Sequence, residues 1–190
     1  MNEKGLFKKS FFILNNMIKE IKSKKFTLRP FRMSDAESVA KHANDKAISR
    51  NLSSFPDPYT EKDARFWLGK KIKLQRQKNP QDIVFGIEIN HQIVGSIGLH
   101  DIKHRHKAEL GFWLGREFWG GGIMTDAVKK VANFGFKDLK LRRIHAGVLL
   151  FNKGSVRVLE KNGFKLEGVS KKEVKKDEKF IDAYIFAKIN

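Results

Sequence analysis

Three consecutive glycines, Gly120 to Gly122 in the segment EFWGGGIMTDA, constrain the fold of this chain more than any other feature. They separate an apolar, strand-like run from residues typical of a helix start. A glycine turn between a strand and a helix leaves several backbone N–H groups pointing the same way, with the positive end of the helix dipole behind them. Such a turn favours phosphate binding. It is neither a Walker A loop nor a dinucleotide fingerprint, because no Gly-Lys-Ser/Thr and no third spaced glycine follow.

The flanking patterns predict alternating strands and helices. Apolar alternation and β-branched residues predict strands over 25–31, 82–89, 93–102, 107–115, 142–150, 165–174 and 179–189. Apolar residues at helical spacing, preceded by the capping residues Ser34, Thr60 and Asn152, predict helices over 34–45, 60–77, 123–135 and 152–163. The sequence has no internal repeat and no linker, so we expect one domain over residues 25–190.

Composition excludes several classes of protein. The chain has 190 residues, 41% of them hydrophobic, which is enough for one packed core. It has no Cys, which excludes disulfides, thiolate nucleophiles and cysteine-ligated metal. No apolar run approaches the roughly 18 residues of a membrane span. We therefore expect a cytoplasmic protein, a monomer or a homodimer, with no membrane partner.

The formal net charge of +18 has two interpretations. Such a field draws a protein toward polyanions, for example ribosomal RNA, or toward an anionic cofactor. The basic residues, however, are mostly scattered lysines, whereas nucleic-acid readers combine clustered arginines with stacking aromatic residues. A compositional bias is the favoured interpretation, and association with the ribosome stays open.

An N-terminal extension, residues 1–24, precedes the predicted domain. Its apolar residues are spaced by four, three, four and three, which predicts an amphipathic helix added to the fold: Phe7, Phe11, Leu14, Ile18 and Ile21. Met17 is also a plausible start, so the alternative is a dispensable extension.

The order of the segments AELGFWL, EFWGGGIMTDA and RIHAGVLLFNKGSVRVLEKNGF resembles the GNAT acetyltransferase superfamily, in particular its branch of Rim-type ribosomal-protein N-terminal acetyltransferases. The resemblance covers roughly residues 26 to 188. It implies an α/β (α+β) domain with a central mixed, mostly antiparallel sheet of about six to seven strands flanked by about four helices. It also implies acetyl-CoA as cosubstrate, no metal, and transfer of the acetyl group to a primary amine.

The resemblance assigns the pyrophosphate of coenzyme A to the glycine turn. The family pattern Gln/Arg-x-x-Gly-x-Gly/Ala falls with its glycines on Gly120 and Gly122, whereas Glu117 stands at the first position and departs from it. We expect Arg116 beside it to assist, and the backbone to bind through Gly120, Gly121, Gly122, Ile123, Met124 and Thr125, the last also through its hydroxyl. Asn152 resembles the residue that binds the pantetheine arm. The backbone near Gly111 and Phe112, in a bulged or splayed strand, is expected to stabilise the oxyanion.

An amine must be neutral before it attacks a thioester. At pH 7 this costs about 1.4 kcal/mol for an α-amino group and about 4.6 kcal/mol for a lysine side chain. A positioned carboxylate can remove the proton. Glu109, alone in an apolar strand, is the predicted base, and the resemblance points to the same residue; the alternative is a structural charge paired with Lys107 or Arg143. Ser155 matches the family position of the proton donor to the leaving thiolate.

Other interpretations compete with the enzymatic one. His100, His104 and His106 could hold a metal, but a solvated turn is favoured. The three tryptophans are expected in the core or in pocket walls. A catalytically inactive, ribosome- or RNA-associated binding module is the alternative function; the charge supports it, and the presence of Glu109 and Ser155 argues against it. The acceptor amine stays open: a protein N-terminus, a polyamine, an aminoglycoside or another small amine. Residues 49–61 and the C-terminal strand pair are expected to wall its site.

Overall fold

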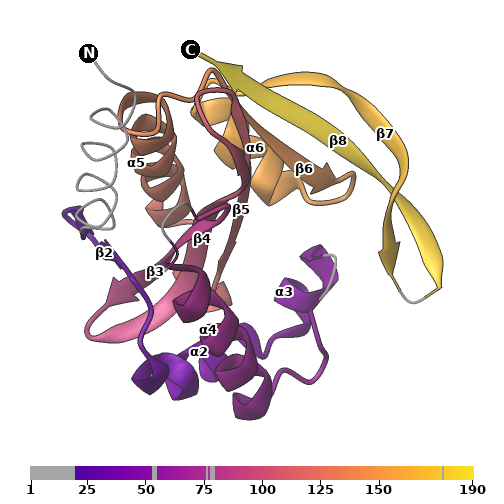
Figure 1. Cartoon of the computed structure of the whole chain (residues 1–190). Helices are drawn as coiled ribbons and strands as arrows, with labels where there is room; N and C mark the ends of the chain where they lie inside the picture. Colours follow the sequence, from indigo (N-terminus) through magenta and orange to yellow (C-terminus); the bar gives the residue numbers. More distant parts are fainter. Residues whose placement is uncertain (1–19, 53–54, 76, 78–79, 177) are drawn as a thin grey trace, which may run out of the picture.

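The computed structural model describes residues 20–52, 55–75, 77, 80–176 and 178–190. The predicted N-terminal helix lies almost entirely on residues outside these ranges. Within them the chain forms one mixed eight-stranded sheet with five α-helices (Figure 1).

The sheet has the spatial order β1-β2-β3-β4-β5-β6-β8-β7. Its strands are β1 (Ile21–Lys22), β2 (Thr27–Arg29), β3 (Ile83–Ile89), β4 (Gln92–Lys103), β5 (Lys107–Leu114), β6 (Arg143–Leu149), β7 (Lys165–Lys176) and β8 (Lys179–Ile189). Neighbouring strands are antiparallel except β5 and β6, which are parallel. This parallel pair joins the N-terminal part of the sheet, β1 to β5, to its C-terminal part, β6 to β8.

Helices cover both faces of the sheet. On one face, α2 (Ala36–Ala43) and α4 (Glu61–Gln75) pack over a core that includes Val84, Ile93 and Trp113. On the other, α5 (Ile123–Lys137) and α6 (Lys153–Lys161) cover the larger core, because the apolar stripe of α5 recurs at helical spacing and is fully buried. The short α3 (Lys46–Asn51) follows α2.

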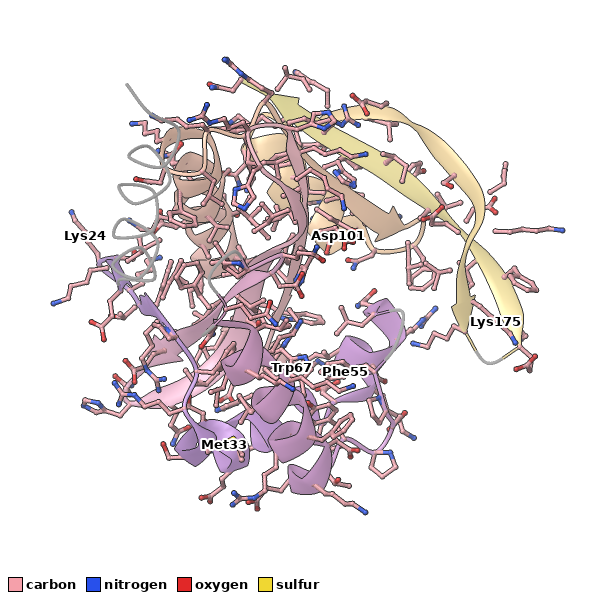
Figure 2. All side chains as sticks on the ribbon, in the orientation of Figure 1. Lys24, Met33, Phe55, Trp67, Asp101 and Lys175 are labelled. Atoms are coloured by element: carbon pink, nitrogen blue, oxygen red, sulfur yellow. The ribbon has the colours of Figure 1, made fainter. Side chains whose placement is uncertain are left out.

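The C-terminal strands β7 and β8 form a long hairpin that extends beyond the rest of the sheet (Figure 1). Lys175 lies near its far end, and Phe55 and Trp67 lie among the helices (Figure 2). Most of β7 is exposed. The hairpin therefore forms a wall of its own beside the sheet.

The predicted α+β class and the single domain are confirmed, but the element counts were low. The eighth strand is β1, whose two residues are too few for a visible alternation. The fifth helix is α3. It begins after the Asp45 cap, between the two helices predicted over 34–45 and 60–77, where the sequence predicts no helix. The first helix also starts later than predicted: Met33–Asp35 is a 3-10 turn, and the Asp35 carboxylate accepts from the Arg32 N–H at 2.7 Å, so Ser34 is not the cap.

Candidate active site

The sheet opens between β5 and β6. The two strands pair only from Lys107–Arg143 to Glu109–His145. Beyond that point β5 continues to Leu114 along β4, and β6 continues to Leu149 along β8. Within the described part of the chain, the β6-facing edge of β5 around Gly111 and Phe112 consequently has no strand partner, in the segment where the resemblance implies a splayed strand. An extended ligand can pair with these backbone groups.

The glycine turn lies between this opening and α5. Gly120 and Gly122 have φ values of 78° and 76°, which an L side chain rarely adopts. A Cβ at either position would meet no atom within 4 Å, so conformation and not crowding requires glycine here. Among the described residues, no acceptor is found for the backbone N–H groups of residues 120–125. Six N–H groups without a described acceptor at the N-terminus of a 15-residue helix are able to bind an anion.

The side chains around this turn agree with binding through the backbone. Ile123 and Met124 are buried, so they can offer a ligand only their N–H groups. Thr125 is half-buried. Arg116 is exposed, with one guanidinium nitrogen 4.0 Å from the Asp45 carboxylate, and is free to approach a phosphate.

Contacts from distant segments hold the turn in place. The Lys25 ammonium donates to the Gly121 carbonyl at 2.8 Å, and the Trp119 indole N–H donates to the Leu114 carbonyl at 2.7 Å. The first bond holds the turn itself at Gly121, and the second holds the residue just before it, Trp119. Lys25 also brings a positive charge to the turn.

His42 of α2 is a part of the site that sequence reasoning missed. Its side chain is only 3% exposed, and its Nδ1 lies 2.9 Å from Glu117 Oε1. Its Nε2 lies 3.2 Å from Gln92 Oε1, and its ring packs edge-to-face on Phe118. Glu117, which departs from the family pattern, is thus held by a buried imidazole. Helical spacing alone would have assigned His42 to the core, and only the pairing reveals its role.

Glu109 is half-buried in β5 and has two histidines as its sheet neighbours. Its Cα partner in β4 is His100, and its partner in β6 is His145. Among the described residues it forms no ion pair. The alternative partner Arg143 donates instead to Glu167 and lowers the pKa of that carboxyl, and Lys107 is exposed. Glu109 is therefore available to a ligand on this face of the sheet.

Asn152 caps α6 as its sequence context predicts. Its side-chain oxygen accepts from the Ser155 N–H at 3.0 Å. The cap places Ser155 in the first turn of a helix that starts just after β6, on the far side of the opening from β5. Glu109 and Ser155 therefore flank the opening from its two sides. The role of Ser155 toward a thiolate stays a prediction.

The histidine cluster of the β4–β5 turn does not assemble. His100 turns toward Asp82, and His104 and His106 are exposed. Within the described ranges no group of three or more His, Asp or Glu side chains could hold a metal ion. In the same part of the chain, no helix is both long and apolar enough to cross a membrane.

The two segments expected to wall the acceptor site, residues 49–61 and the C-terminal hairpin, contact each other; that they wall an acceptor site stays a prediction. The Lys176 ammonium donates to the carbonyls of Ser49 and Leu52, the latter at 3.0 Å. The Arg50 guanidinium lies over the Phe151 ring, 5.2 Å from its centroid. The first contact joins α3 to the hairpin, and the second joins α3 to the loop between β6 and α6.

A family model for the acetyltransferase (GNAT) domain matches residues 25–165. The chain therefore belongs to the GNAT acetyltransferases, which transfer acetyl groups from acyl-CoA.

Three known proteins illustrate the likeness. The chain is 33% identical over 179 residues to Probable N-acetyltransferase YjcK of Bacillus subtilis, covering 90% of this chain and 97% of the relative. The crystal structure of ribosomal-protein-S5-alanine acetyltransferase from Vibrio fischeri superposes with a TM-score of 0.80 at 25% identity, over 90% of this chain and 97% of that one. The self-immunity acetyltransferase MccE, solved with acetyl-CoA and AMP, shares the fold with a TM-score of 0.77 at 23% identity, over 88% and 94%.

Proposed function

We propose that this protein transfers the acetyl group of acetyl-CoA to a primary amine by direct attack, with Glu109 as general base. The observation that carries the proposal is the opening between β5 and β6 next to six unpaired N–H donors. The free edge of β5 can pair with an extended, amide-containing ligand. The helix N-terminus can bind the phosphates of the same ligand.

The donor fits these groups part by part. The N–H groups of residues 120–125, Arg116 and Lys25 bind the pyrophosphate. The pantetheine amides pair along the free edge of β5 and meet Asn152. The thioester carbonyl then lies near the backbone N–H groups of Gly111 and Phe112, which stabilise its oxygen as negative charge develops there. The acetyl-CoA complex of MccE supports this arrangement at the level of the fold.

The chemistry needs three proton movements. Glu109 accepts a proton from the ammonium form of the acceptor, through a water, and the neutral amine attacks the carbonyl carbon. The tetrahedral intermediate collapses with cleavage of the C–S bond. The hydroxyl of Ser155 protonates the departing thiolate and regains a proton from the new amide nitrogen. Acetylated amine and coenzyme A leave, and one proton stays on the base for release to water.

The acceptor is a protein N-terminus or a small amine. An α-amino group is about 3 kcal/mol easier to deprotonate than a lysine side chain at pH 7, the difference between about 4.6 and about 1.4. The similarity to a ribosomal-protein-S5-alanine acetyltransferase supports an N-terminal acceptor. We rank a peptide α-amine first and a small primary amine second.

A thiol-release assay with acetyl-CoA tests the proposal. The panel contains peptides with free N-termini, the same peptides with blocked N-termini and a free lysine, polyamines and aminoglycosides. Acetylation of at least one free amine, with one thiol released per product, is expected. Coenzyme A binding without turnover on any amine would favour a binding module that keeps the fold.

A further inference from the structure

His100 of β4 and Asp82 form a hydrogen-bonded pair on the face of the sheet that carries Glu109. The Nδ1 atom of His100 lies 3.2 Å from Asp82 Oδ2. The same carboxylate oxygen accepts from the Lys71 ammonium of α4 at 3.2 Å, and the Asp101 N–H is 3.3 Å from Oδ1. Asp82 therefore fixes which nitrogen of His100 carries a proton and leaves Nε2 as the acceptor.

Several groups keep Asp82 charged. Burial alone would raise the pKa of Asp82, but the hydrogen bond from His100 and the charges of His100 and Lys71 together lower it. The carboxylate is thus ionised through the neutral range. A histidine oriented by an ionised carboxylate is the arrangement by which proteins stabilise an imidazolium while it holds a proton.

The free side of the imidazole points along the sheet toward the opening. A Cβ built on Gly111 would lie 3.2 Å from His100 Nε2, so the ring lies over Gly111, whose missing side chain makes room for it. Among the described residues no hydrogen-bond partner is found for Nε2. The His100 side chain is 28% exposed, which gives a proton a route to solvent.

Glu109 lies directly beside this pair. His100 and Glu109 are Cα partners in the antiparallel β4–β5 ladder, and their side chains leave the same face. Such partners have Cβ atoms about 5 Å apart, so a carboxylate and an imidazole can exchange a proton directly or through one water. Asp82, Lys71 and Glu109 are charged groups that lie beside His100 in this arrangement, and His145 of β6 is the other sheet neighbour of Glu109.

From this juxtaposition we infer that His100 is a further catalytic residue, which receives the amine proton from Glu109 and passes it to solvent. The inference rests on the proposed function. In each turnover, Glu109 takes one proton from the acceptor ammonium and transfers it to His100 Nε2. The imidazolium is stabilised by Asp82 and then loses the proton to water. No electron moves, and both side chains return to their starting states.

The test compares His100→Asn with wild type on an acceptor found in the thiol-release assay. Asn retains a donor toward Asp82 but has no basic nitrogen. We expect the maximal rate to fall about 10-fold and its pH profile to change, with coenzyme A affinity and melting temperature unchanged. His104→Asn, an exposed histidine in the following turn, is the matched control and should behave as wild type.

Three further comparisons separate catalysis from structure. Asp82→Asn/His100→Asn should be no slower than His100→Asn, because the two residues act as one unit. In a Glu109→Gln background, His100→Asn should have no further effect, since proton transfer to His100 starts at Glu109. Free imidazole should restore activity to His100→Ala.

The outcomes are distinguishable. If wild type acetylates no amine, the proposed function fails and the inference falls with it. If wild type is active but His100→Asn retains the full rate and pH profile, only the inference is overturned. An equal effect of His100→Asn with and without Glu109, or no rescue by imidazole, also overturns it.

Discussion

The two sides of the opening between β5 and β6 are built from different material. The donor side consists of main chain: the unpaired N–H groups of residues 120–125 and the free edge of β5. The face toward the acceptor consists of side chains: Glu109, His100 and Asp82, with the contacts of Lys176 and Arg50 behind them. Under the proposed function, binding of the cosubstrate would depend on backbone conformation, whereas proton removal would depend on which side chains the strand register brings together.

The largest expected effect is on the side-chain face. Glu109→Gln keeps the shape of the residue but cannot accept a proton, so the maximal rate should fall about 100-fold or more while coenzyme A affinity stays within about twofold. The rate deficit should narrow as the pH approaches the pKa of the acceptor amine, because solution then supplies the neutral form. Steady-state kinetics from pH 6.5 to 9.5 measure it. A deficit constant over that range would mean that Glu109 positions the amine.

Glu167→Gln is the matched control for this variant. It also removes a carboxylate near the acceptor face, but one that is exposed and paired with Arg143. Its rate should stay within about twofold of wild type, because an exposed ion pair contributes about 0–1 kcal/mol.

The second effect is on the main-chain side. Gly122→Val places a β-branched residue at a φ of 76°, which should turn the N–H groups of the loop away from their common direction. Coenzyme A affinity should fall about 10-fold or more, measured by titration calorimetry on protein shown by circular dichroism to be folded. Wild-type affinity in such a folded variant would contradict the assignment of the pyrophosphate to this turn.

A smaller effect is expected for His42 of α2, which contacts Glu117 in the segment before the glycines. His42→Ala removes the buried partner of Glu117 and loosens the segment before the glycines. We expect coenzyme A to bind about fivefold more weakly, with the rate at saturating acetyl-CoA unchanged and some loss of thermal stability. His91→Ala, at an exposed turn, is the control. A lowered saturating rate with unchanged affinity would show that His42 acts on the acceptor face instead.

The smallest effect is predicted for the N-terminal extension. A chain beginning at Met17 keeps β1, which pairs with β2, Ser23, whose hydroxyl donates to Asp126, and Lys25, which donates to the Gly121 carbonyl. It should fold and bind coenzyme A with wild-type affinity. Failure of the shortened chain to fold would show that residues 1–16 belong to the core.

How much of the site can be predicted from the sequence follows the same division between main chain and side chains. The glycine turn and the Asn152 cap could be predicted because each is encoded by residues close together in the chain. The pairs His42–Gln92 and His100–Asp82 could not be predicted in this way. The first joins residues 50 positions apart, and the second depends on which residues the sheet brings together. Strand β1 was missed because two residues show no period.

The sequence alone also does not single out His100 among the three neighbouring histidines. His100 was assigned to a solvated turn together with His104 and His106, and spacing alone cannot separate the three. What distinguishes His100 is its place within β4, opposite Glu109, whereas the other two follow the end of the strand. The register of the β4–β5 ladder, with its shift after His100, is a tertiary property.

The central claim is that a main-chain site binds the donor beside a side chain that accepts the proton. The most direct test measures the single-turnover rate as a function of acetyl-CoA concentration, for Gly122→Val and Glu109→Gln in parallel. The two-sided account predicts that Gly122→Val needs at least about 10-fold more acetyl-CoA but reaches nearly the wild-type rate at saturation. Glu109→Gln should saturate at wild-type concentrations with a rate about 100-fold lower. A saturating rate lowered equally in both variants, with unchanged half-saturating concentrations, would contradict the division between the two sides.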